Sequence, residues 1–209
     1  ESGAVATRQE AKIAVLGAMY GSTSGDSGRL VPRLRLAFPT AMGLVDDAAR
    51  TGEQGAVVST WLGRSSPGPS EEWMRIQAAA SLPGASARDE ELARRSARDW
   101  GRFTRNFVVQ GTAAEWALVW MAELRRRLSA FAPVDSGPLA DASGPVFARR
   151  AHLVFFLHDE VIVHAPREQA PAVAAAVEDA ARAAARLLFG DAPVDFRLDL
   201  RISERADKD

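Results

Sequence analysis

Cysteine is absent from the 209 residues, which excludes disulfides, thiolate metal sites and cysteine nucleophiles. Long apolar runs are absent as well. None approaches the roughly 20 residues that a membrane span needs, and no secretory signal opens the chain. The formal net charge is −1 at pH 7, so any polyanion would have to bind at a local basic patch. We therefore expect a cytoplasmic protein with no membrane partner.

Lysine is almost absent, because only Lys12 and Lys208 occur among the 26 basic residues and the other 24 are arginine. The hydrophobic fraction of 47% and the charged fraction of 25% are typical of a globular chain. The length suffices for one large domain or two small ones. The chain begins with Glu1 rather than Met, in the approach to a predicted helix, and we expect it to be a piece of a longer protein.

Hydrophobic periodicity predicts an α+β chain, with helices on one face of an antiparallel sheet in its last third. Thr7 followed by Glu10 is a capping-box pattern that starts the first helix, and Gly111 is a candidate position for a break in the longest one. Helices are expected over 7–20, 40–55, 89–128 and 167–189, strands over 56–64 and 194–202, a hairpin over 152–164, and mostly loop over 65–87 and 132–148. One face of the longest helix is expected to carry Phe103, Phe107, Ala114, Leu118 and Met121.

Two cations near the start of the first predicted helix face the same way. Arg8, Lys12, Leu16 and Tyr20 are spaced by four residues and form one stripe. The amides of a helix N-terminus already favour anions, so Arg8 and Lys12 form a candidate triphosphate cradle. The presence of Lys12 in a chain that otherwise uses arginine adds a little support. The alternative is an ordinary solvated basic edge.

A second stripe lies on the longest predicted helix. Arg102, Asn106 and Gln110 are also spaced by four residues. Such side chains can bond the minor-groove acceptors that all four base pairs present in similar places, and so hold a duplex without reading its sequence. The alternative is a set of polar residues at the rim of a core helix.

The stretch HLVFFLHDEVIVH (residues 152–164) interrupts two apolar runs with His158, Asp159 and Glu160. A hairpin with these residues at its tip would fix Asp159 in place by strand packing. Mg²⁺ is usually held by one or two carboxylates together with substrate phosphates and waters, so Asp159 is a candidate ligand. The alternatives are an acidic hairpin turn and a metal phosphohydrolase of the His-Asp type, for which only three histidines are available.

These segments, in this order, resemble the C-terminal part of family A DNA polymerases, the DNA polymerase I type. The spacing R8-x3-K12-x7-YG resembles motif B, and TWLGR (60–64) resembles the family's TLxGR segment. RNFVVQGTAAE (105–115) is similar to FNxxVQGTAAD, the most specific match, and HDEVIVHAP (158–166) is similar to motif C, HDExxxExP. The resemblance covers nearly the whole chain. The composition further suggests an actinobacterial subgroup of the family.

The resemblance implies a fold, a cofactor and partners. Residues 1–64 would form part of the fingers, 65–97 a loop-rich connection, and 98–209 part of the palm with its antiparallel sheet. The partners would be primer–template DNA, deoxynucleoside triphosphates and the upstream remainder of the same polypeptide, and the cofactor would be Mg²⁺ at a two-metal site. By position, the nucleotide-binding residues would be Arg8, Lys12, Leu16 and Tyr20; the DNA-binding residues Arg102, Asn106, Gln110 and His158; and the catalytic residues Lys12, Asp159 and Glu160, with Asp159 as the metal ligand.

The sequence also departs from the family pattern. No segment resembles motif A, which carries the other metal-binding aspartate, so we expect the isolated chain to show no primer extension. Leu16 stands where the family usually has Phe or Tyr, and His164 replaces the usual acid after motif C. Two other functions stay open: a primer–template-binding module that has lost catalysis, and a relative of single-subunit RNA polymerases.

Overall fold

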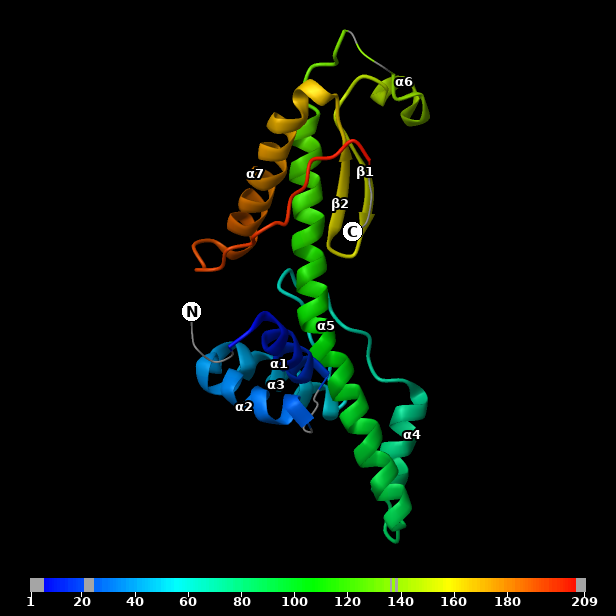
Figure 1. Ribbon diagram of the computed structural model, residues 1–209. Helices are drawn as coiled ribbons and strands as arrows, with labels where there is room; N and C mark the ends of the chain where they lie inside the picture. Colours follow the sequence, from blue (N-terminus) through cyan, green and yellow to red (C-terminus); the bar gives the residue numbers. More distant parts are fainter. Residues whose placement is uncertain (1–5, 21–24, 136, 138, 206–209) are drawn as a thin grey trace. The chain divides into compact units, whose positions relative to one another are not determined.

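The computed structural model describes residues 6–20, 25–135, 137 and 139–205, and it contains helices together with one antiparallel pair of strands (Figure 1). The expected α+β class is confirmed in its coarse form, a chain that combines helices with antiparallel strands. The chain divides into two compact units, Glu1–Ala113 and Ala114–Asp209. The elements are α1 (Arg8–Tyr20), α2 (Gly25–Ala37), α3 (Pro39–Glu53), α4 (Glu71–Ala80), α5 (Ala87–Leu128), η1 (Asp141–Ser143), α6 (Gly144–Phe147), β1 (His152–Leu157), β2 (Glu160–His164), η2 (Arg167–Gln169) and α7 (Ala170–Phe189).

The predicted start of the first helix is confirmed. The Thr7 hydroxyl oxygen accepts a hydrogen bond from the Glu10 amide at 3.1 Å, and the Glu10 carboxylate accepts one from the Ala6 amide at 2.8 Å. The second bond comes from one residue earlier than in the standard capping box. The bond from the Glu10 amide satisfies a donor that the first turn of a helix cannot pair internally.

Small side chains on α1 allow the first three helices to share a core. Ala14 and Ala18 are buried on α1, and Gly17 lies so close to α2 that an added Cβ would be 2.6 Å from the Ser27 Cβ. No helix was expected over 25–37, where Pro32 removes one backbone hydrogen bond, but burial of leucines on α2 outweighs that loss. The buried members of this core are Ala14, Ala18, Leu30, Leu34, Met42 and Val45.

Helix α4 corrects the expectation that residues 65–87 are mostly loop. The Ser70 hydroxyl caps it by accepting from the Trp73 amide at 3.2 Å. Its polar side chains then bond backbone carbonyls of α5: the Trp73 indole donates to Ser96 at 3.3 Å, and the Gln77 amide donates to Ala93 at 3.0 Å. The prolines and serines of this segment lie before or after the helix and do not interrupt it.

The expected strand over 56–64 is also wrong. This segment is a loop with one isolated antiparallel bridge between Ser59 and Ser65. The Val58 carbonyl accepts from the Ser66 amide at 2.8 Å, and the Thr60 amide donates to the Arg64 carbonyl at 2.9 Å. These bonds close a tight turn and leave no ladder for a longer strand.

Helix α5 runs without a break through Gly111, the candidate position for one. The loop residue Thr60 packs where a side chain at position 111 would be, which accounts for a glycine within the helix. Its buried face also differs from the predicted one. Leu118 is 58% exposed, whereas Thr104 and Leu124 are fully buried. The prediction followed the largest apolar side chains, but close helix packing buries small residues as readily as large ones.

Residues Ala114–Asp209 pack the hairpin and α7 against the C-terminal part of α5 (Figure 1). The buried core joins Trp120 and Leu124 of α5 to an alanine-rich face of α7. Residues 194–202 are extended but form no strand, and β1 and β2 are the whole sheet in the described part of the chain. Burial alternates along the middle of this segment: Phe196, Leu198 and Leu200 are partly buried and Asp195, Arg197, Asp199 and Arg201 are exposed, whereas the terminal Val194 and Ile202 are exposed as well. Residues 132–148, expected to be mostly loop, contain the short helices η1 and α6.

We expect Gly52→Ala to destabilise the protein by about 1–3 kcal/mol, because an added Cβ would overlap the buried Thr104 side chain of α5. The matched control is Gly43→Ala in the same helix, where nothing lies within 4 Å of an added Cβ. That change should be neutral or stabilise by up to about 1 kcal/mol, since alanine favours helix more than glycine does. Urea denaturation followed by circular dichroism measures both, and equal midpoints for the two variants would contradict the packing.

Candidate functional site

The predicted hairpin is present, and its turn has two residues. β1 and β2 are antiparallel, with the pair Leu157 and Glu160 next to the turn. His158 and Asp159 therefore form the tip, and Glu160 is the first residue of β2. All three are exposed.

His158 has a φ of +56°, which no other described residue except glycine shares. Two-residue hairpin turns need positive φ at their first position, and glycine normally supplies it. A histidine in this region costs roughly 1 kcal/mol or more. Such strain at the tip of a hairpin, beside two carboxylates, is typical of a functional site.

The base of the hairpin is fixed by packing on one face. Leu153, Val161 and Val163 lie against the core formed by α5 and α7. The buried His152 adds polar anchors, since its Nδ1 lies 2.8 Å from the Arg150 carbonyl oxygen and its Nε2 lies 2.9 Å from the Ser143 hydroxyl. An isolated hairpin is marginally stable in water, so these contacts hold the tip in place.

The carboxylates of Asp159 and Glu160 fit the donor chemistry of Mg²⁺, which prefers oxygen ligands. Neither forms an ion pair or a side-chain hydrogen bond with the described residues. Within residues 6–20, 25–135, 137 and 139–205, no group of three or more His, Cys, Asp or Glu side chains is placed to hold a metal. A metal at this tip would therefore take its remaining ligands from outside these residues, such as substrate phosphates and water.

The candidate nucleotide-binding residues lie on α1. Arg8 and Lys12 are exposed, and neither forms an ion pair with the described residues. Leu16, one turn further on, is 44% exposed. Tyr20 ends the helix, and its side chain lies outside the described part of the structure. The solvent-facing side of α1 thus presents two free cations followed by an apolar surface.

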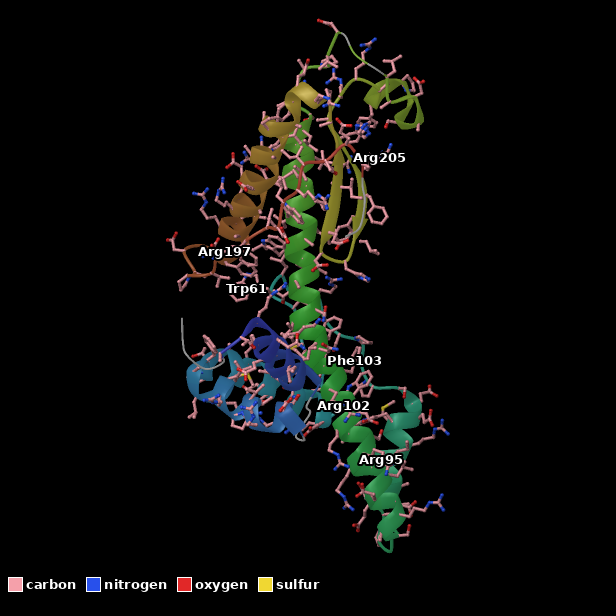
Figure 2. All side chains as sticks on the ribbon, in the orientation of Figure 1. Trp61, Arg95, Arg102, Phe103, Arg197 and Arg205 are labelled. Carbon is pink, nitrogen blue, oxygen red and sulfur yellow. The ribbon has the colours of Figure 1, made fainter. Side chains whose placement is uncertain are left out.

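Three of the four candidate DNA-binding residues, Arg102, Asn106 and Gln110, lie on α5 within the same unit as α1, and the fourth, His158, lies at the hairpin tip. Figure 2 labels Arg102 on α5. Arg102 is exposed and forms an ion pair with Asp99 one turn before it. Such a surface pair contributes little and can exchange for another anion. Asn106 is partly buried, and its Oδ1 has no hydrogen-bond donor in the described structure. Gln110 is exposed.

Arg105 is a residue of this region that the sequence analysis did not single out. Its side chain is only 13% exposed, and it bonds Asp46 of α3 and the Ala18 carbonyl of α1. One signal was present in the sequence: Arg105 stands where the family stretch FNxxVQGTAAD has phenylalanine.

The candidate residues fall in both compact units. Those on α1 and α5 belong to Glu1–Ala113, and those of the hairpin belong to Ala114–Asp209. The predicted division at residues 64 and 97 into fingers, connection and palm stays a prediction. Helices long and apolar enough to span a membrane are missing from the described ranges. In comparisons with protein-family models and with curated proteins, the sequence has no match.

Proposed function

We propose that this chain is the fingers and second palm portion of a DNA polymerase of family A. In this proposal the parent protein adds deoxynucleoside monophosphates to a primer 3′ end under the direction of a template. The observation that carries it is the two-residue hairpin tip, where Asp159 is exposed beside a strained His158. The resemblance of motifs B and C and of VQGTAAE adds to this support.

The proposed reaction is an in-line displacement at the α-phosphorus. The bond from the primer 3′ oxygen to phosphorus forms, the bond to pyrophosphate breaks, and the hydroxyl proton passes to water. Bound Mg²⁺ would stabilise the attacking and leaving oxygens. The chain would contribute mainly by positioning the reactants and by stabilising charge. Asp159 would hold a metal ion, and Glu160 would assist next to it. His158 would lie near the primer end.

The side chains of α1 would contribute charge to the same reaction. Arg8 and Lys12 have no competing ion pair within the described residues, so both are available to a triphosphate. Charged hydrogen bonds to phosphate oxygens are the stronger kind. Leu16 would lie next to the sugar and base.

Primer extension by the full polypeptide and by its Asp159→Ala variant tests the proposal. With Mg²⁺ and templated deoxynucleotides, we expect the variant to lose several orders of magnitude in rate, because a ligand of the two-metal site is removed. The matched control is Asp191→Ala, which removes an exposed carboxylate elsewhere in the same unit and should keep normal activity. If both the parent and Asp159→Ala bind primer–template equally and neither extends it, the chain is a binding module without catalysis.

His158→Gly is expected to separate stability from activity. Glycine adopts positive φ freely, so the free energy of unfolding should rise by about 1 kcal/mol. Extension should nevertheless slow, since the side chain near the primer end is lost. His158→Asn tolerates the same backbone conformation better than most residues do, and it is the control for side-chain chemistry. A gain in both stability and extension rate would remove His158 from the proposed site.

Lys12→Ala and Arg8→Ala are each expected to raise the KM for deoxynucleoside triphosphates by about tenfold, as expected for loss of a charged hydrogen bond to phosphate. Arg33→Ala on α2 is the matched control, because Arg33 is an exposed cation outside the proposed cradle. Steady-state extension at varied nucleotide concentration measures the three values. An unchanged KM in both α1 variants would assign these cations to an ordinary solvated surface.

A further inference from the structure

A buried guanidinium connects the last turn of α1 to α3 and α5. Arg105 Nη1 donates to the Ala18 carbonyl oxygen at 2.9 Å, and Arg105 Nη2 donates to Asp46 Oδ1 at 3.2 Å. The side chains of Arg105 and Asp46 are each 13% exposed. A helix leaves its last four carbonyls without internal partners, and Arg105 supplies a donor to one of them.

Asp46 also accepts from α2. Arg35 forms a two-bond pair with it, with Nη2 at 3.0 Å from Oδ1 and Nη1 bonding Oδ2. One carboxylate therefore pairs with both arginines, and the cluster joins α1, α2, α3 and α5. Removing Asp46 would leave the largely buried guanidinium of Arg105 without its carboxylate partner.

The apolar core connects α5 to α1 less extensively. Its buried members come from α1, α2 and α3, and the contribution from α5 is the partly buried Val109. Apolar contacts are also non-directional, so they tolerate small rotations and shifts of a helix. The Arg105 hydrogen bond is directional, and it acts at the end of α1, where Ala18 lies six residues beyond Lys12.

We propose that Arg105 is a positioning residue that holds α1, and with it Arg8 and Lys12, against the part of α5 that carries Arg102, Asn106 and Gln110. The placement of α1 by Arg105 does not depend on the proposed function. The expected effect of that placement on the affinity for the nucleoside triphosphate does rest on it.

The chemistry requires arginine. Arg105 bonds a carbonyl with one terminal nitrogen and a carboxylate with the other, and the planar fork holds both donors in fixed directions. Lysine keeps the charge but offers a single flexible ammonium group. Arg105→Lys therefore removes the two-way connection while it still neutralises Asp46.

The test uses the full polypeptide with Arg105→Lys and Asp46→Asn. Hydrogen exchange should speed up in the amides of α1 by about tenfold in both variants, as expected when a charged hydrogen bond that limits local opening is lost. In Arg105→Lys, which leaves the pair between Arg35 and Asp46 in place, exchange in α2 and α3 should change little, which separates positioning from a general loss of stability. In extension assays the KM for deoxynucleoside triphosphates should rise by about tenfold, with kcat within about twofold.

Arg94→Lys is the matched control, because it alters an exposed arginine of α5 whose ion pairs in the described part of the chain are with Glu90 and Glu91. It should leave both readouts unchanged. Unchanged α1 exchange in Arg105→Lys, or equal acceleration across α1, α2 and α3, would overturn the inference. Selective acceleration in α1 supports it even if no protein extends a primer, an outcome that would reject the proposed function alone.

Discussion

The crossing of α3 and α5 is the contact on which the N-terminal unit depends. At this crossing each helix presents a glycine to the other: Gly52 faces Thr104, and Gly101 faces the Ala49 carbonyl oxygen, which would lie 2.8 Å from an added Cβ. The fully buried Thr104 hydroxyl then donates to the Ala48 carbonyl at 2.7 Å. Because Arg105 follows Thr104 directly, the same close approach brings its guanidinium within reach of Asp46. Packing at the glycines thus sets the geometry of the charged cluster.

In the hairpin, the unfavourable backbone conformation at the tip is offset by packing of the strands. Its inner face lies on the α5 and α7 core, and its tip keeps a non-glycine residue at positive φ. Its outer face remains apolar and open in the described structure, since Phe155, Leu157 and Ile162 are 38–47% exposed. A turn optimised for stability alone would place glycine or asparagine at position 158. Under the proposed function, the place of the His158 side chain near the primer end would account for a histidine at this position.

The sequence predicted features that depend on local patterns and missed those that depend on distant partners. The helix start at Thr7 and the hairpin over 152–164 follow from capping and turn position, whereas the strand expected over 194–202 is an extended segment without a partner strand in the described part of the chain. The extended segment forms no strand because alternation determines which side chains face inward, whereas a strand also needs a neighbour with free backbone groups. Helix α4 was missed because its stabilising bonds go to carbonyls of α5, about 20 residues away in sequence. In the candidate site, exposure of Arg8, Lys12 and Asp159 was predictable, but the burial of Arg105 was not, since its partners come from α1 and α3.

The departures from the family pattern differ in how the fold accommodates them. Arg105 has Asp46 and Ala18 as partners. His164 lies opposite His152 across the hairpin, with ring centroids 5.5 Å apart. Arg105 and His164 thus both have contacts with neighbours within the chain, as expected of residues that contribute to packing or to the positioning of other residues. Leu16 is 44% exposed on the face of α1 that carries Arg8 and Lys12. A change on such a surface acts on whatever binds there, so under the proposed function Leu16 is, of these three residues, the one that would bear most directly on the choice of nucleotide.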